Sequence, residues 1–314
     1  MGLSARLGRR ARIDEMTREP FNGATAYASD VLTVRSMGGD VFKVFVKDFR
    51  SSTLPKDEPV ARCRRELGVY RELLADADLG TAGYYGSFET GTDGRHQLLI
   101  EFVHGIDLRS SEFPHWVQAA GWLARLHGSF VARTERLAAC EFLVRHDAEF
   151  FTSRADSALR AMGEFSETLE ARLRFLLHGY DHIVETMVDQ PRTLVHGSYR
   201  PNNILVRAES TTRPIVPVDW ELAAMGAPLY DLAFLADGFR PPDLDTLLDA
   251  YRRQADLEGL FVPDPEELHY LLGCFQLHKV MKSLSDSVLL GFSQKSVEKL
   301  MHTAEQLDQG LMTP

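Results

Sequence analysis

Asn203 and Asp219 are the residues whose types and spacing point most directly to chemistry. Between them lie two short apolar runs, 204–207 and 214–218, joined by a polar connector, which is the pattern of a β-hairpin. Because antiparallel strands return the chain to its starting end, we expect both residues at the open end of this hairpin. Their amide and carboxylate oxygens are ligands that Mg²⁺ takes alongside substrate phosphates. The sequence therefore predicts a magnesium site here, although Asn and Asp are also common turn residues.

The elements around this hairpin suggest two lobes. The first third contains β-rich runs, 31–36, 41–47, 82–89 and 96–103, and one helix that begins at Asp57-Glu58-Pro59. From there the chain becomes mainly helical, and Gly128 is expected to stop the helix that starts near Phe113. We therefore predict an α+β fold with a small β-rich lobe over residues 1–103 and a larger, mainly helical lobe over 104–314.

The composition is that of an ordinary globular protein, with 314 residues, 44% hydrophobic and 25% charged. The net charge of −10 argues against nucleic acid as a partner, because phosphate binding needs a basic surface. No stretch approaches the ~20 apolar residues of a membrane span. The three cysteines are far apart and form no metal-binding or disulfide pattern, which fits a reducing cytoplasm.

The chain resembles the aminoglycoside phosphotransferase and choline kinase-like superfamily, which is related to the protein kinases. The resemblance covers residues 41–237 and is most specific at His196–Val206, at Val218–Glu221 and at Gly226–Ala233. It implies a two-lobed kinase-like fold and an enzyme that transfers the γ-phosphate of ATP, with Mg²⁺, to a hydroxyl group. It also implies that Asn203 and Asp219 hold the Mg²⁺ ions that bridge the nucleotide phosphates.

The same resemblance gives roles to residues of the catalytic loop. His196 would orient the loop by hydrogen bonding, and Asp231 would brace it from below. Arg200 lies where relatives carry Lys or His, and its guanidinium could steady the transferring phosphoryl group. A plain surface arginine is an equally good interpretation of Arg200.

In the small lobe, Lys47 resembles the lysine that holds the nucleotide phosphates. Lys43 lies on the same strand face and competes for this role, but the apolar run directly before Lys47 favours Lys47. Glu66 is the expected ion-pair partner of Lys47. The segment from Glu101 to Gly105 resembles the hinge, where backbone groups of Glu101 and Val103 would bind the adenine ring.

Ser198 departs from the family pattern, because relatives carry at this position an aspartate that accepts the proton of the attacking hydroxyl. A serine cannot act as that base near neutral pH, and general-base catalysis contributes about 10²–10⁴-fold. Metal and cationic groups supply most of phosphoryl-transfer catalysis, so activity can survive, with Glu221 or an acceptor group as base. The alternative is a pseudokinase that binds a nucleotide or a partner without transfer.

The acceptor is the least determined feature. A small molecule, such as an aminoglycoside, and a peptide Ser or Thr both remain open. The strings Thr53–Asp57 and Gly83–Ser87 resemble kinase-like proteins of ribosomal-peptide pathways, in which a partner protein would complete the site. The acidic segment 243–267 would suit a cationic acceptor, although helices with solvated acidic faces explain it as well.

Overall fold

The computed structural model describes residues 12–23, 26–53, 55–89, 96–208, 210 and 212–311. The chain divides into two compact units. The first unit comprises Met1–Trp116 and Pro201–Ala223, and the second comprises Val117–Arg200 and Ala224–Pro314. This division differs from the predicted lobes of 1–103 and 104–314 at two places, because residues 104–116 and the hairpin segment 201–223 belong with the first unit.

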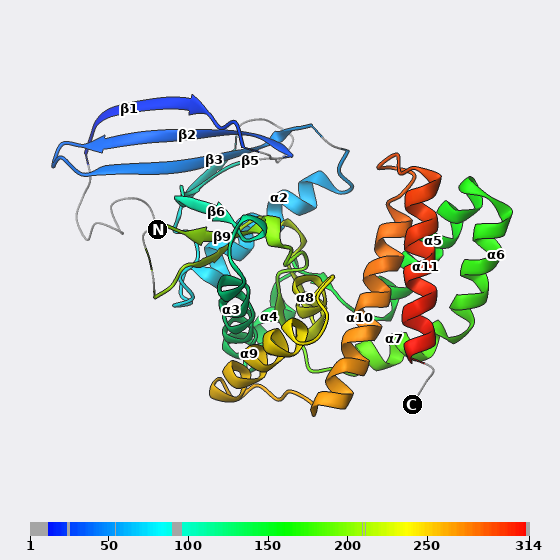
Figure 1. Cartoon of the computed structure of the whole chain (residues 1–314). Coiled ribbons are helices and arrows are strands. Elements are labelled where there is room, and N and C mark those ends of the chain that lie inside the picture. Colours follow the sequence, from blue (N-terminus) through cyan, green and yellow to red (C-terminus); the bar gives the residue numbers. More distant parts are fainter. Residues whose placement is uncertain are drawn as a thin grey trace. The chain divides into compact units, whose positions relative to one another are not determined.

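A five-stranded antiparallel sheet forms the main layer of the first unit. Its order is β1-β2-β3-β5-β4, and Figure 1 shows the three long strands β1, β2 and β3 side by side. The strands are β1 (Ile13–Pro20), β2 (Tyr27–Ser36), β3 (Val41–Ser52), β4 (Tyr84–Glu89) and β5 (His96–Glu101). Alternate residues of β2 and β3 build the core of the sheet, with Val34, Val44 and Val46 each at most 4% exposed. The edge strand β1 was not predicted, and its residues are all exposed.

One helix packs beside this sheet, as predicted. Helix α2 (Pro59–Gly68) has a proline in its first turn, where a missing N–H costs nothing, and runs directly into the π-helix η1 (Val69–Leu74). Cys63, Leu67 and Tyr70 recur at helical spacing and are buried, whereas Val60 in the first turn is 37% exposed.

The predicted hairpin is present and belongs to a second, three-stranded sheet. Strands β9 (Ile204–Arg207) and β10 (Ile215–Pro217) pair antiparallel, with Val216 opposite Leu205. The sheet order is β10-β9-β6, so β10 lies at an edge, where Pro217 is tolerated. The third strand, β6 (Gly105–Asp107), was not predicted.

The second unit is mainly helical. Its small sheet has the order β7-β11-β8 and consists of β7 (Val144–Arg145), β8 (Thr193–Val195) and β11 (Ala224–Gly226). Helix α3 (Phe113–Val131) leads into it. The other helices are α4 (Thr134–Ala139), α5 (Ala148–Phe165), α6 (Glu167–Leu176), α7 (Tyr180–Val188), α8 (Pro228–Leu235), α9 (Asp243–Leu257), α10 (Pro265–Ser285) and α11 (Gln294–Leu311). Helix α10 packs against α5, α8 and α11, and Figure 1 shows α10 and α11 side by side.

Gly128 does not stop α3, which was a wrong prediction, because the helix continues to Val131. A Cβ atom added at Gly128 would lie 2.3 Å from Cβ of Glu258. The glycine therefore permits close packing and is not a helix end.

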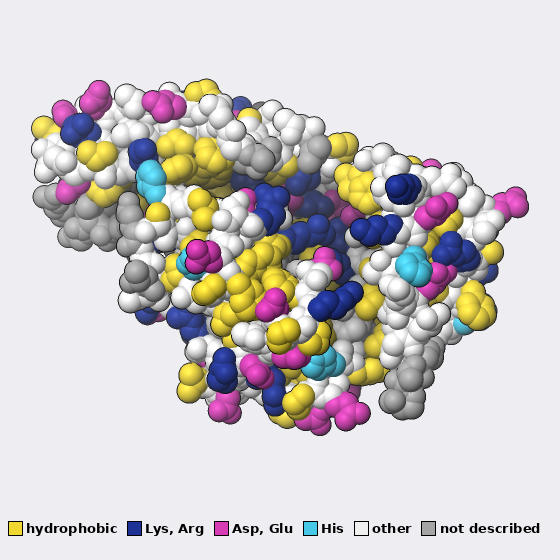
Figure 2. Space-filling view, viewed as in Figure 1, with side chains coloured by type: hydrophobic (Ala, Val, Ile, Leu, Met, Phe, Trp, Pro, Cys, Tyr) yellow, Lys and Arg dark blue, Asp and Glu magenta, His cyan; other side chains and the backbone are white. Residues whose placement is uncertain are grey.

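The surface of the second unit carries charges of both signs. Figure 2 shows basic and acidic side chains interspersed over α6 and α11. No helix in the described part of the chain is long and apolar enough to cross a membrane.

Candidate active site

The predicted metal ligands, Asn203 and Asp219, both lie at the open end of the β9–β10 hairpin. The backbone N–H of Val218 donates to the carbonyl oxygen of Asn203 at 2.9 Å, one step beyond the last strand pair. Asp219 follows directly and has left-handed backbone angles, φ 68° and ψ 61°. A non-glycine residue in this region is uncommon and costs about 1–3 kcal/mol, so the surrounding structure must hold it there.

Lys47 lies against this end of the hairpin. Its Nζ atom donates to Oε2 of Glu66 at 2.6 Å and to Oδ1 of Asp219 at 2.5 Å. The sequence predicted the contact with Glu66, and the contact with Asp219 joins the strand lysine to the hairpin. Lys43, the competitor, is exposed, and its Nζ atom lies 5.9 Å from the centre of the Phe102 ring.

The charge of Lys47 is strongly favoured. Burial opposes the charge, but the carboxylates of Asp219 and Glu66 outweigh burial and raise the pKa of Lys47 well above its usual value. The lysine side chain is 10% exposed and Glu66 only 2%, whereas Asp219 is 36% exposed. Asp219 is therefore the member of the trio that solvent or a ligand can reach.

Three carboxylates gather at this point. Glu66, Asp219 and Glu221 each offer an oxygen atom, and these atoms lie within 4.8 Å of one another. Carboxylate oxygens are the ligands that hard divalent cations take. Glu66 is held by Lys47, so the more exposed Asp219, together with the amide of Asn203, is the part of this set that suits a magnesium ion.

Glu221 is held by three side chains of the first unit, and the sequence had offered it as an alternative base. Its Oε1 atom accepts from Lys56 Nζ at 2.5 Å and from Arg62 Nη1 at 3.0 Å, and its Oε2 atom accepts from the Tyr27 hydroxyl at 3.0 Å. Arg65 also donates to the backbone oxygen of Glu221 at 2.6 Å. Both carboxylate oxygens are thus engaged, which argues against Glu221 as a base and for a structural role.

The predicted hinge follows β5. Glu101 is anchored by its side chain, since Oε2 accepts from the Gly83 N–H at 3.1 Å and Oε1 pairs with Arg207 Nη1 at 2.6 Å. The backbone N–H of the following residue, Phe102, donates to the Lys43 carbonyl oxygen at 3.0 Å. Val103 is buried. These contacts attach the hinge to β3, to β9 and to the residue that precedes β4.

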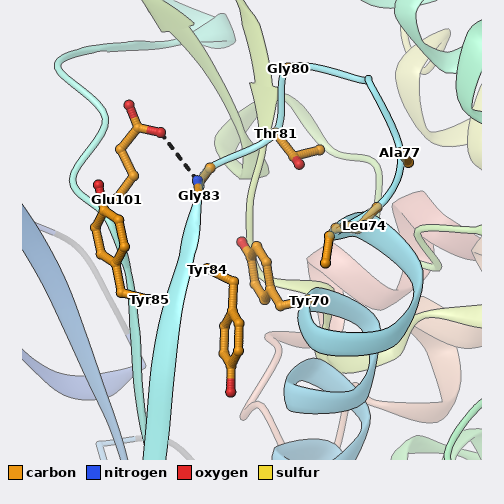
Figure 3. Close-up of a pocket in the computed structure, with 11 residues that line it drawn as sticks. Tyr70, Leu74, Ala77, Gly80, Thr81, Gly83, Tyr84, Tyr85 and Glu101 are labelled. Carbon is orange, nitrogen blue, oxygen red and sulfur yellow. Dashed lines mark hydrogen bonds between the residues drawn. The ribbon is translucent and has the colours of Figure 1, made fainter. Parts of the chain in front are cut away.

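A cavity of about 340 Å³ lies beside Glu101, and Figure 3 shows Tyr70, Leu74 and Tyr84 around it. The described residues that line it do not include Lys47, Asn203 or Asp219. The cavity is therefore lined by η1, by the segment 75–83 that follows it and by the sheet, and Lys47 and the metal ligands lie elsewhere.

The catalytic loop lies in the second unit and is held from α8. Asp231 is fully buried, and its carboxylate accepts from the backbone N–H of His196 at 2.5 Å and of Gly197 at 3.0 Å. Gly197 has φ 76°, which glycine adopts without strain. This geometry is what the predicted bracing role of Asp231 requires. His196 is buried, and its ring meets that of Tyr199 edge to face.

His127 lies next to Asp231, which the sequence did not predict. Its Nε2 atom lies 3.6 Å from Oδ2 of Asp231, and its Nδ1 atom lies 2.8 Å from the Tyr251 hydroxyl. Burial lowers the pKa of His127, so the neutral ring is favoured. A lone histidine on an apolar helix gave no signal for this contact.

Ser198 and Arg200 lie together on the same loop. The N–H of Arg200 donates to the Ser198 carbonyl oxygen at 2.7 Å, and the Arg200 guanidinium lies 5.1 Å from the centre of the Phe234 ring. Ser198 is half-buried. Thus Lys47, Glu66, Asn203 and Asp219 belong to the first unit, whereas His196, Ser198, Arg200 and Asp231 belong to the second.

Comparisons with known proteins agree with this arrangement. The model of the phosphotransferase enzyme family matches residues 28–271. One curated relative, acyl-CoA dehydrogenase family member 10 of Mus musculus, is 31% identical over 88 residues. That match covers 28% of this chain, and the chain spans only 8% of the length of the relative.

Solved structures share the fold at low identity. A mutant of aminoglycoside 2'-phosphotransferase-IIIa with GDP has a TM-score of 0.66 at 14% identity, covering 96% of this chain and 94% of that one. A thermostable mutant of APH(4)-Ia with ADP and hygromycin B has a TM-score of 0.61 at 16% identity, and the match covers 99% of this chain and 98% of that one.

A third solved structure is the macrolide 2'-phosphotransferase MphH from Brachybacterium faecium, without ligand. Its TM-score is 0.59 at 18% identity, and the match covers 99% of this chain and 97% of that one. The expected α+β, kinase-like fold is confirmed by these matches. Since the family model spans most of the sequence, the chain belongs to the phosphotransferase enzyme family.

Proposed function

We propose that the chain transfers the γ-phosphate of ATP to a hydroxyl group of a small molecule, with Mg²⁺ as cofactor. The observation that carries this proposal is the position of Lys47 between Glu66 and Asp219 at the end of the hairpin that starts from Asn203. A lysine and hard oxygen ligands together suit the phosphates of a metal-bound nucleotide. Neighbouring structures were crystallised with ADP, AMP-PNP and GDP, which supports a nucleotide as the donor.

In this proposal the residues of the first unit bind the donor. Asn203 and Asp219 would hold Mg²⁺, and a bound Mg²⁺ would neutralise charge on the nucleotide phosphates. Lys47 donates to the phosphates, and Glu66 keeps the lysine in place and charged. The backbone groups of Glu101 and Val103 bind the adenine ring.

In the transfer step, a bond forms between the acceptor oxygen and the γ-phosphorus, and the bond from that phosphorus to ADP breaks. Asp231 and His196 fix the loop, and Arg200 can donate to the phosphoryl oxygens. Ser198 cannot take the hydroxyl proton near neutral pH, so the proton passes to water or to an acceptor group. Because the usual base is absent, we expect a transfer rate up to about 10²–10⁴-fold below that of an enzyme with an aspartate at this position.

Ser198 also favours a second candidate function, a pseudokinase that binds nucleotide without transfer. The retained Asn203 and Asp219 favour the enzyme over this alternative. A peptide acceptor and a partner protein that completes the site gain no support from the comparisons, whose complexes contain small molecules such as hygromycin B and kanamycin.

The first test is calorimetry of ATP binding with and without Mg²⁺. We expect Mg²⁺ to strengthen binding, and Asp219→Asn to remove most of that gain. Asp76→Asn, an exposed aspartate of the same unit, is the matched control and should behave as the wild type. Equal ATP affinity with and without Mg²⁺, or no binding at all, would contradict the proposal.

The second test separates the enzyme from the pseudokinase. Full-length protein is incubated with ATP, Mg²⁺ and a panel of hydroxyl compounds, and products are detected by mass. A phosphorylated product that disappears with Asn203→Ala supports transfer. The pseudokinase is supported if the protein binds ATP but gives no product with any compound of the panel. The same must hold for Ser198→Asp, which restores a carboxylate.

A further inference from the structure

Three cations of the second unit gather beside the catalytic loop, and we call Arg200, Lys279 and Lys282 the basic cluster. Arg200 and Lys279 face the same aromatic ring, since the guanidinium carbon lies 5.1 Å and the lysine Nζ 5.9 Å from the centre of Phe234. Lys279 and Lys282 are three residues apart on α10 and so share one side of that helix.

Each lysine of the cluster has one carboxylate partner. Lys279 pairs with Asp237, and Lys282 Nζ lies 2.7 Å from Oδ2 of Asp286. The lysine side chains are only 15% and 20% exposed. Within the described part of the chain no carboxylate pairs with Arg200, so the cluster carries more positive than negative charge.

The cations of the cluster act on one another. Burial lowers the pKa of Lys279 and of Lys282, and the positive charge of Arg200 lowers both further, against the opposing effect of Asp237 and Asp286. Arg154 on α5 adds to the lowering at Lys282. Concentrating like charges away from water is unfavourable unless an anion compensates them.

One polar atom of the cluster lacks a partner. The Nε atom of Arg200 is buried and makes no hydrogen bond with any residue that the structure describes. A buried donor without an acceptor is unfavourable, and a guanidinium presents its donors in a fork that matches a carboxylate or a phosphate. This donor is the second observation that points to an anionic ligand.

The cluster is built on the same elements as the loop. Helix α8 carries Asp231, which holds the loop backbone, and Phe234, which contacts Arg200 and Lys279. Arg200 is two residues after Ser198 and bonded to it through the backbone. A group bound by the cluster therefore lies beside the loop that takes part in transfer.

We propose that the basic cluster binds an anionic group, a carboxylate or a phosphate, of the acceptor that carries the hydroxyl. This inference rests on the proposed function and names the acceptor class. It disfavours a polycationic acceptor such as an aminoglycoside, which three neighbouring cations would repel. The acidic segment 243–267, which would have suited such a cation, includes the mostly exposed acidic residues of α9.

The test measures binding of simple anions to the full-length protein by calorimetry. Inorganic phosphate and citrate are the anionic probes, and kanamycin is the cationic probe. Each probe is titrated with and without saturating ADP and Mg²⁺, so that binding to the nucleotide site is removed in one arm. We expect phosphate or citrate to bind in both arms and kanamycin in neither.

Variants locate the binding. Lys282→Gln and Arg200→Gln should weaken the anionic probe about tenfold or more, because a hydrogen bond to a charged group contributes about 1.5–3 kcal/mol. Lys299→Gln, an exposed lysine on α11, is the matched control and should leave the affinity unchanged. The affinity for ADP with Mg²⁺ should stay the same in Lys282→Gln and in the control, and circular dichroism verifies that all three variants fold.

Four outcomes are distinguishable. Anion binding that the cluster variants leave unchanged, or no anion binding by the wild type, overturns the inference. The cluster variants could weaken ADP binding and leave the affinity for the anionic probe in the presence of ADP unchanged. That result assigns the cluster to the nucleotide phosphates and also overturns the inference. Binding of kanamycin in preference to phosphate and citrate overturns the acceptor class. Loss of ATP binding by the wild type, with cluster-dependent anion binding intact, refutes the proposed function and not the cluster.

Discussion

Glu221→Ala tests whether this buried carboxylate holds the first unit together. The side chain is 4% exposed and accepts hydrogen bonds from Lys56, Arg62 and Tyr27. Lys56 precedes α2 and Arg62 lies on it, so Glu221 ties the helix to the segment after the hairpin. Removal of the carboxylate leaves two cations without their shared partner.

The expected loss can be worked from these contacts. Breaking a buried ion pair by removing one partner costs about 3–5 kcal/mol, because the other charge stays buried. Lys56 and Arg62 are 16% and 13% exposed, so water can partly replace the lost oxygens and the lower end, about 3 kcal/mol, applies. At about 4 °C per kcal/mol for a unit of this size, the Tm should fall by about 12 °C. Glu221→Gln keeps one acceptor oxygen, so its Tm should fall by roughly half as much.

Thermal unfolding followed by circular dichroism measures both variants. The control is Glu72→Gln, an exposed glutamate at the C-terminal end of the same helical segment, for which we expect a change below about 2 °C. A double variant, Lys56→Ala with Glu221→Ala, should be less destabilised than the sum of its single changes, because one unpaired cation is removed as well. Additive effects, or a Tm of Glu221→Ala within about 2 °C of the wild type, would refute the reasoning.

Three further outcomes are expected. Lys47→Gln should weaken binding of ATP with Mg²⁺ about tenfold or more, whereas Lys43→Gln should leave it within about twofold in the same calorimetric titration; the reverse order would move the lysine role to Lys43. If transfer is established, Ser198→Ala should retain most of the initial rate in a product assay, and loss of activity with ATP binding intact would show that the serine takes a direct part. The Arg50 guanidinium holds the pKa of Asp48 below its usual range, so the folded state binds that proton less readily than the unfolded state. The stability that this carboxylate contributes is therefore present above about pH 4 and lost as the pH falls, and Asp48→Asn should flatten the dependence of Tm on pH between about 5 and 2; an unchanged slope would contradict this.

Local patterns predicted the parts of the site that neighbouring residues determine. The hairpin follows from two short apolar runs around a polar connector, and its pairing places the ends at Asn203 and Asp219. The apolar run directly before Lys47 favoured it over Lys43, which lies on the same strand face. Glu66 was expected as the ion-pair partner of Lys47, and the two side chains are in contact.

Tertiary contacts determined what the sequence could not predict. Strand β1 has little apolar alternation and forms through its pairing with β2. A glycine at position 128 predicted the end of a helix, but the close approach of Glu258 explains why a glycine is present there. Glu221 and Lys56 are 165 positions apart, so no local pattern could show their contact. The basic cluster likewise joins a loop to a helix that follows about 80 residues later.

The division of the chain at residues 200 and 201 falls inside the catalytic loop, between Arg200 and Asn203. If the proposed roles hold, donor specificity and acceptor specificity are encoded in different bodies, although their residues are neighbours in sequence. Substitutions on α10 could then change which compound is phosphorylated while the nucleotide affinity stays the same, since effects at separate sites add. A scaffold of this kind can diversify its acceptors by exchanging a few charges on one helix, and directed evolution of this protein should begin there.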